Sequence, residues 1–142
     1  MSRYSIDVSL DRERWQSLDA FTQGYVEAAF WLLDEEIGDR PFSDLAPKAL
    51  ATAVADCKDF REGLPKDAHG RTALDLACDY MAHPTVAYDE YRAGIDFFLT
   101  RNRHGAGFWD RGLGKVGDEL SEHAHGYGEA GLYEGDDGRL YF

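Results

Sequence analysis

Apolar residues recur at intervals of three and four along most of this chain, and that spacing limits the folds open to it. The clearest case is segment 17–33, whose apolar positions are Leu18, Phe21, Tyr25, Ala28, Ala29 and Leu32. Residues three or four apart lie on one face of an α-helix, so this segment is predicted to be an amphipathic helix. The same spacing predicts four further helices, which span about 47–62, 72 to the break at Pro84, 85–105 and 113–125.

Local signals support several of the predicted helix ends. Pro47 suits a first helical turn, Thr72 is a good N-cap, and Gly63 favours a helix end at that point. In the helix 85–105, Asp96 falls on the face that is predicted to meet water.

Two short segments have the features of strands. At the N-terminus apolar and polar residues alternate, the apolar ones being Tyr4, Ile6, Val8 and Leu10. This period of two predicts a short edge strand or an ordered arm. Near the C-terminus two apolar runs flank GDDG at 135–138, which accepts the positive φ of a tight turn and predicts a β-hairpin. The predicted fold is therefore mainly α (α+β): a single domain over 1–142, with four to five helices, a small C-terminal β-hairpin and an N-terminal strand that can join it.

The charge balance of the chain is strongly acidic. It has 15 Lys plus Arg against 27 Asp plus Glu, a formal net charge of -12. This charge opposes binding to nucleic acid and to anionic membranes, so we expect neither as a direct partner and favour a cationic protein. The simpler interpretation is that the acidity only keeps the protein soluble; the alternative is that the acidic surface imitates a nucleic-acid backbone.

The cysteines and the hydropathy indicate an intracellular protein. Cys57 and Cys78 both lie in helical apolar patterns, where free Cys behaves as a small buried hydrophobe, so a reducing compartment is expected. Residues 1–10 lack an apolar run of signal-peptide length, and no stretch approaches the roughly 18 apolar residues that span a bilayer. We therefore expect a cytoplasmic protein that does not enter a membrane.

Residues 96–114 differ from the other segments by joining a cationic cluster to four glycines and an aromatic pair. Glycine lets a backbone approach a ligand and arginine pairs with anionic groups, so one interpretation is a nucleotide or phosphate site. Its candidate binding residues are Arg101, Asn102, Arg103, His104, Asp110 and Arg111.

The alternative for the same segment is a structural junction. A helix would end at Gly105, Phe108 and Trp109 would turn into the core, and the cations, including Lys115, would bind the protein's own carboxylates. The glycine spacing matches neither the Walker nor the Rossmann pattern, so we favour the junction and expect no cofactor.

A catalytic site and a metal site are both less favoured than a structural role for the histidines. His104 with Asp96 or Asp110 is the pairing best suited to acid–base chemistry, yet a His oriented by an Asp is also a common structural arrangement, so no catalytic residue is assigned. A metal site would need His104, Asp110, His123 and His125. The last two are two residues apart and point in different directions on a helix, so no metal is expected.

Acidic residues cluster at two places that are far apart in the sequence. The candidate partner-binding surface consists of Asp34, Glu35, Glu36 and Asp39 from the first third and Glu134, Asp136 and Asp137 near the end. If the fold brings both clusters to one face with a spacing like that of phosphates, they would fit the nucleic-acid channel of another protein. Chance clustering on an acidic surface is the alternative.

The second half of the chain, 91–142, resembles a group of small bacteriophage and prophage proteins of uncharacterised function. The resemblance is carried by the motif F-x-L-T-R-N-x-H-G-A-G-F-W-D-R at 97–111, by GLGKVGDEL at 112–120 and by LYEGDDGRLY at 132–141, with a weaker likeness at 24–31. It implies a phage origin and action inside an infected bacterium, but it supplies no activity. Segment 58–85 departs from the pattern.

Acidity, small size and the resemblance together favour a phage accessory protein that binds a host nucleic-acid-handling or defence protein, such as a restriction or CRISPR complex, and inhibits or modulates it. A different class of function is a small nucleotide- or ligand-binding protein, or an enzyme, that uses the loop 101–111. That class requires a concave pocket with the Arg and His side chains facing inward. An assembly role through exposed aromatic surface is a third alternative.

Overall fold

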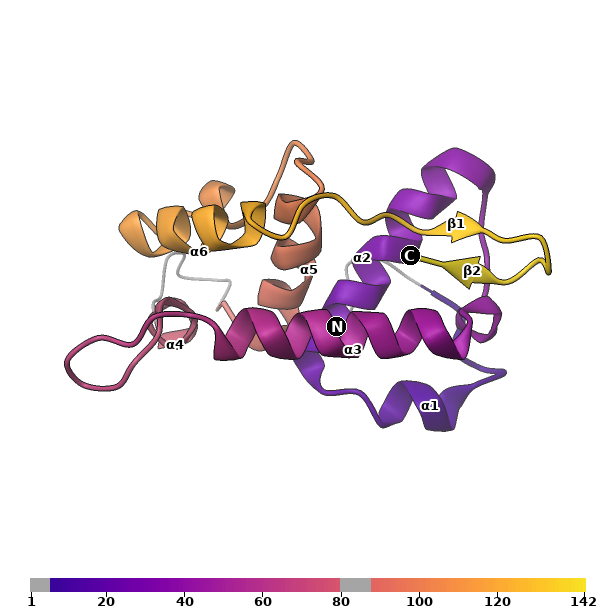
Figure 1. Ribbon diagram of the computed structural model, residues 1–142, viewed down its shortest axis with the longest axis horizontal. Helices are drawn as coiled ribbons and strands as arrows, with labels where there is room; N and C mark the ends of the chain where they lie inside the picture. Colours follow the sequence, from indigo (N-terminus) through magenta and orange to yellow (C-terminus); the bar gives the residue numbers. More distant parts are fainter. Residues whose placement is uncertain (1–5, 80–87) are drawn as a thin grey trace.

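Two helices, α2 (Ala20–Ile37) and α5 (Glu90–Arg101), pack against each other at the centre of the molecule (Figure 1). The structure is a computed structural model that describes residues 6–79 and 88–142. Around the central pair lie the helices α1 (Arg12–Gln16), α3 (Pro47–Glu62), α4 (Ala73–Asp79) and α6 (Lys115–His125), the short 3-10 helices η1 (Phe42–Asp44) and η2 (Phe108–Asp110), and the strands β1 (Tyr133–Glu134) and β2 (Leu140–Tyr141).

Glycines allow α2 and α5 to approach this closely. A Cβ on Gly24 of α2 would collide with the carbonyl oxygen of Tyr91, and a Cβ on Gly94 of α5 would collide with the carbonyl oxygen of Phe21. Both obstacles are backbone atoms of the facing helix, so they cannot move aside unless the helices separate. Glycine costs a helix about 1 kcal/mol relative to alanine, and close packing is what these two positions gain in return.

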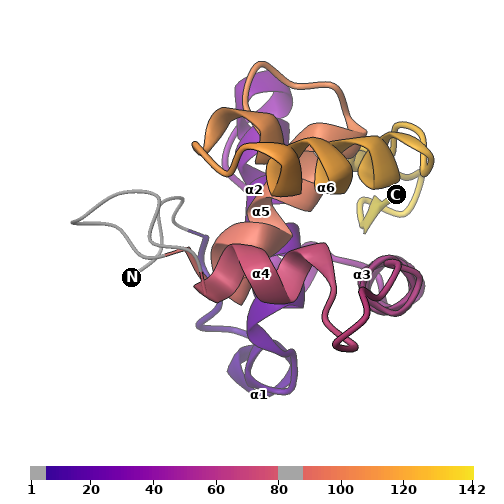
Figure 2. The ribbon, with the colours of Figure 1, turned by 90° about the vertical axis from the view of Figure 1, so that its left-hand side faces the viewer.

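Aromatic rings from several elements fill the core. Phe60 of α3 stacks on Phe97 of α5 with ring centroids 4.2 Å apart, and on Phe108 of η2 at 5.8 Å. Tyr25 of α2 lies 5.3 Å from Phe97. These four side chains are at most 1% exposed, so one cluster joins α2, α3, α5 and η2. Figure 2, viewed from the end that carries α4 and α6, shows α3 to one side of the central helices.

The predicted mainly helical architecture is confirmed, and the caps explain where two helices begin. α3 has the predicted bounds. Thr72 caps α4 as predicted: its Oγ1 accepts the N–H of Asp75 at 3.2 Å, and its own N–H donates to Asp75 Oδ2 at 3.0 Å. α2 begins later than predicted because Asp19 is its N-cap and accepts the N–H of Thr22 at 2.9 Å.

The fourth predicted helix is shorter at both ends than the sequence indicated. Asp89 is the N-cap of α5 and accepts the N–H of Arg92 at 2.9 Å, so Tyr88 precedes the helix. The start predicted near Thr85 and the break at Pro84 lie outside the described residues, as does Tyr4.

Of the two alternatives for the N-terminus, the strand is wrong for residues 6–10, and an ordered arm fits them, since the N–H of Phe42 donates to the carbonyl of Asp7 at 2.9 Å. Asp7 Oδ1 accepts both the N–H and the hydroxyl of Ser9, at 2.9 and 2.6 Å, and this local turn competes with strand pairing. The short helix α1 that follows has too few residues to show a period and was not predicted. The position beside β2 is occupied instead by Leu45, which forms a parallel bridge to Leu140.

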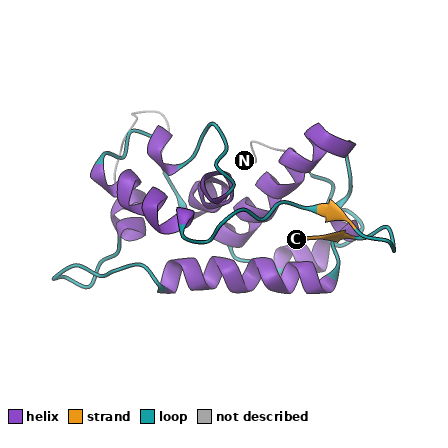
Figure 3. Cartoon of the chain, turned by 45° about the horizontal axis from the view of Figure 1, so that its top comes forward, coloured by secondary structure: helices purple, strands orange, loops and turns teal. Residues whose placement is uncertain are grey.

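The predicted C-terminal hairpin is confirmed (Figure 3). β1 and β2 are antiparallel, with Tyr133 opposite Tyr141 and Glu134 opposite Leu140. Gly138 has a φ of 80°, as its turn requires.

We predict that Gly94→Ala lowers the free energy of unfolding by about 3 kcal/mol, because the added methyl group forces α5 away from α2. Urea denaturation followed by circular dichroism measures the change. Gly105→Ala is the matched control: a Cβ at Gly105 meets open space, so the change should stay within about 0.5 kcal/mol. Equal effects of the two substitutions would contradict the role given to Gly94.

Candidate functional site

Helix α5 ends about one turn earlier than predicted, and an arginine rather than a glycine takes the left-handed position after it. Arg103 has a φ of 54°. Its N–H donates to the carbonyl of Thr100 at 3.0 Å, and the N–H of His104 donates to the carbonyl of Leu99 at 2.9 Å. These two bonds form a Schellman motif that satisfies the last carbonyls of the helix. The prediction that Gly105 ends the helix is therefore wrong, since Gly105 follows the motif.

The guanidinium of Arg101 donates hydrogen bonds to groups of the protein itself. Its Nη1 donates to Asp56 Oδ2 at 2.8 Å and to the hydroxyl of Tyr25 at 3.0 Å. Its Nε and Nη2 donate to the carbonyls of Gly128 and Tyr127 at 2.9 and 3.2 Å. Arg101 is only 5% exposed, and burial raises the pKa of the Tyr25 phenol beside it. A phosphate ligand would have to displace these internal partners.

Arg111 also binds an internal carboxylate, that of Asp96. The prediction that Asp96 lies on a solvent-exposed helix face is wrong. Asp96 is 1% exposed. Its Oδ1 accepts Arg111 Nε and Nη2 at 3.0 and 2.8 Å, and its Oδ2 accepts the hydroxyl of Tyr88 at 2.7 Å. Burial and the neighbouring carboxylate raise the pKa of Tyr88, so it stays a donor at neutral pH. Asp96 therefore binds Arg111 and Tyr88 rather than His104.

The remaining candidate residues are divided between internal contacts and the surface. Asn102 Nδ2 donates to the carbonyl of Phe98 at 2.9 Å, and its Oδ1 accepts the N–H of Ala130 at 2.8 Å. Arg103 and Asp110 are exposed. The six predicted binding residues thus do not converge on one pocket.

The aromatic pair that follows is split by the 3-10 helix η2. Phe108 is fully buried as predicted, whereas Trp109 is 52% exposed, so its predicted burial is wrong. Successive residues of a 3-10 helix point about a third of a turn apart, and one face of η2 meets the core. The segment has the internal contacts of a junction.

His123 and the two cysteines, which lie outside this loop, are placed for packing. The ring of His123 lies 5.1 Å from that of Phe60. Cys57 and Cys78 are free thiols; burial raises the pKa of Cys57, and it raises that of Cys78 to about 11. Thiols with raised pKa values are poor nucleophiles at neutral pH. Within residues 6–79 and 88–142, no three His, Cys, Asp or Glu side chains are grouped as metal ligands.

The candidate acidic residues gather at one end of the molecule, where Arg40 fastens two distant segments together. Arg40 Nε donates to Asp44 Oδ2 at 2.7 Å, Nη1 to Glu134 Oε2 at 3.1 Å, and Nη2 to the carbonyl of Gly138 at 2.7 Å. Figure 1 shows the end of α2 and the β1–β2 hairpin at the same end of the molecule, away from α6. We call the acidic end the exposed residues Asp34, Glu35, Glu36, Asp39, Glu134, Asp136 and Asp137.

A cleft of about 450 Å³ lies beside the acidic end. It is bounded by the last turns of α2, by the residues after α5 and by segment 129–132, and its lining includes Asn102 and His104. His104 also packs edge-on against Trp31, with ring centroids 5.4 Å apart. No local sequence signal predicts this cleft, because its walls come from three segments that meet only in the folded chain.

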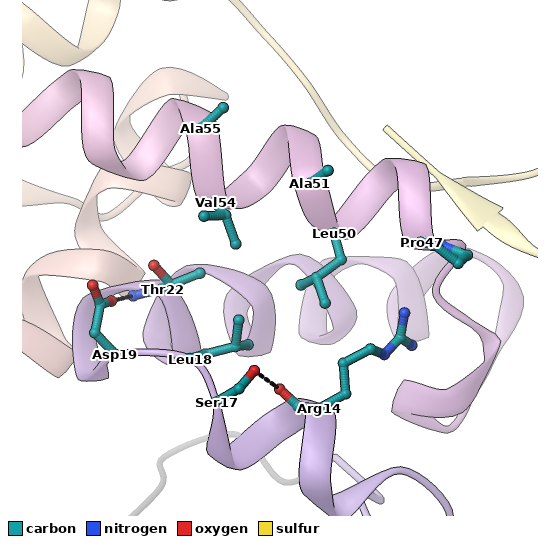
Figure 4. A pocket seen from close by; sticks show the side chains of 10 residues that line it. All are labelled: Arg14, Ser17, Leu18, Asp19, Thr22, Pro47, Leu50, Ala51, Val54 and Ala55. Atoms are coloured by element: carbon teal, nitrogen blue, oxygen red, sulfur yellow. Dashed lines mark hydrogen bonds between the residues drawn. The ribbon is translucent and has the colours of Figure 1, made fainter.

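A larger apolar groove of about 660 Å³ runs between α1 and α3. Figure 4 shows Leu18, Leu50 and Val54 lining it. Two polar groups at its margin are engaged locally: Asp19 caps α2, and Ser17 Oγ donates to the carbonyl of Arg14 at 2.6 Å. The groove offers apolar contact surface.

Comparison of the chain with protein-family models, with curated proteins and with solved structures finds no match. In the part of the chain that the structure describes, no helix has the length and apolar character needed to cross a bilayer.

We predict that Asp96→Asn lowers the free energy of unfolding by about 3 kcal/mol, because it removes the charge that Arg111 binds beneath the surface. Thermal or urea unfolding measures the loss. The exposed Asp110→Asn is the matched control and should change stability by no more than about 0.5 kcal/mol. A loss from Asp96→Asn as small as that of the control would show that the pair does not hold the junction.

Arg103→Gly should raise the free energy of unfolding by about 1 kcal/mol, because glycine takes the left-handed conformation without the Cβ clash. Arg103→Lys, which keeps a Cβ and the charge, should give no gain. If both variants match the parent in urea denaturation, the left-handed conformation at this position carries no cost.

Proposed function

We propose that this chain is a small acidic accessory protein that binds a cationic partner protein through its acidic end and thereby inhibits or modulates that partner. The observation that carries the proposal is the position of Arg40, which binds Asp44 beside it and, about a hundred residues further along the chain, Glu134 and the carbonyl of Gly138, so that the segment after α2 is held against the hairpin. The spacing of the clusters in the sequence gives no reason for them to meet.

The charge at this end supports a cationic partner. Segments 34–44 and 133–141 contain two cations, Arg40 and Arg139, and Arg40 is already paired with Asp44 and Glu134. An excess of exposed carboxylates repels nucleic acid and speeds association with basic surfaces. Proteins that handle nucleic acid carry such basic surfaces, because they neutralise phosphates with Lys and Arg.

The resemblance of 91–142 to small bacteriophage proteins adds a setting to the proposal. On that resemblance we propose an infected bacterium as the setting, where the partner would be a host nucleic-acid-handling or defence protein such as a restriction or CRISPR complex. In this proposal the acidic end occupies the partner's nucleic-acid channel as a mimic of the phosphate backbone.

Affinity capture from a bacterial lysate tests the proposal. We expect the chain to capture a nucleic-acid-binding protein, and we expect the triple variant Asp34→Asn, Asp39→Asn, Asp136→Asn to capture about tenfold less of it. Raising the salt concentration should release the partner from the parent protein.

The matched control is a second triple variant that removes the same amount of charge from α6, namely Asp118→Asn, Glu119→Gln, Glu122→Gln. These residues are exposed and lie away from the acidic end, so capture should be unchanged. Equal losses from the two triple variants would show that capture depends on net charge and not on the acidic end. Capture that does not change with salt concentration would contradict the proposal.

A further inference from the structure

We propose that the cleft beside the acidic end is the receptor for a single arginine side chain of the partner. This inference rests on the proposed function, because it takes the partner to be a cationic protein. The inference adds a specific site for one arginine side chain to the general attraction between the acidic end and a basic surface.

The lining of the cleft combines an apolar base with carboxylates of one sign. Ala29, Leu33 and Leu132 are buried and form its base, with exposed fractions of 1%, 3% and 7%. The carboxylates that line it belong to Glu35, Glu36 and Glu129, and none of the described residues in its lining is Lys or Arg. In the described part of the chain, these three glutamates form no ion pair with the protein's own cations.

The position of the cleft at the end of α2 strengthens the preference for a cation. The C-terminal end of a helix carries a partial negative charge, and the last turn of α2 contains no basic residue to offset it. Glu35 and Glu36 lie in that last turn and add to the negative potential. A cation in the cleft is therefore attracted by the negative end of the helix and by these carboxylates.

His104 contributes a polar atom that lacks an internal partner. Its Nδ1 is buried and makes no hydrogen bond within the protein, although its ring is held against Trp31. Buried polar atoms nearly always have a partner, and an imidazole nitrogen without one can accept from, or donate to, a group that binds beside it. The other polar residue of this wall, Asn102, is satisfied by Phe98 and Ala130.

Arginine matches these features better than lysine does. Its guanidinium is planar, weakly hydrated and supplies five donors, so it can serve several carboxylates while it lies on an apolar surface. The alkyl part of the side chain would cover the buried leucines. Lysine brings a strongly hydrated point charge that gains less from an apolar base.

Binding of labelled oligo-arginine, oligo-lysine and oligo-citrulline, measured by fluorescence anisotropy, tests the inference on the intact chain. Oligo-citrulline keeps the shape of arginine without its charge. We expect oligo-arginine to bind most tightly, oligo-lysine more weakly, and oligo-citrulline not at all. Equal affinities for the arginine and lysine peptides would overturn the arginine selectivity.

Gly131→Leu blocks the cleft without a change of charge. Gly131 lines the cleft, and a Cβ there meets open space, so the leucine side chain can be accommodated. We expect oligo-arginine affinity to fall about tenfold, which corresponds to one lost charge-assisted contact. Gly105→Leu adds the same side chain at an exposed position outside the cleft and should bind like the parent.

The failures of the two proposals are distinguishable. If Gly131→Leu binds oligo-arginine like the parent while the Asp34/Asp39/Asp136 variant binds it weakly, the cleft is overturned and the acidic end stands. If the parent binds no cationic peptide, both are overturned. Should Gly131→Leu not fold, Glu129→Gln compared with the exposed Glu122→Gln decides the point: equal affinities for oligo-arginine would again overturn the cleft.

Discussion

The close contact between α2 and α5 determines where everything else in this molecule can lie. Gly24 and Gly94 bring the backbones together, and the rings of Tyr25 and Phe97 then meet in the space that α3 and η2 close. The C-terminal end of α2 is thereby fixed relative to the residues that leave α5. The cleft and the Schellman motif both lie where these two helix ends are held in register.

The distribution of the arginines explains how a chain of net charge -12 exposes so concentrated an acidic surface. Arg101 and Arg111 are directed inward, where they neutralise Asp56 and Asp96. These two cations hold the junction after α5 and are not interspersed with the exposed carboxylates. The two observations are linked. The internal pairs make 101–111 unsuitable as an open anion site, and each pair withdraws one cation and one carboxylate, so the remaining groups carry the same net charge with fewer cations among them.

The helices and the hairpin could be predicted because their signals are local. The bounds of α3 follow from Pro47 and the apolar period, and the turn of the hairpin follows from its glycines. The burial of Asp96 could not be predicted, because a charged residue on a helix is exposed unless a partner from elsewhere pairs with it, and Arg111 and Tyr88 are brought to it only by folding. The left-handed conformation of Arg103 could not be predicted either. Glycine is the residue that most often follows a helix in this conformation, so the prediction placed the helix end at Gly105.

The fastening by Arg40 has a consequence for any cation that approaches the acidic end. The carboxylate of Glu134 is 49% exposed in its pair with Arg40, so the protein presents this group together with an internal competitor for it. A cation that does take over Glu134 leaves Arg40 bound to Asp44 and to the carbonyl of Gly138, so the hairpin stays attached during the exchange. Under the proposed function, a partner that takes over Glu134 would replace an exposed ion pair worth no more than about 1 kcal/mol, while the hairpin keeps its other contacts with Arg40.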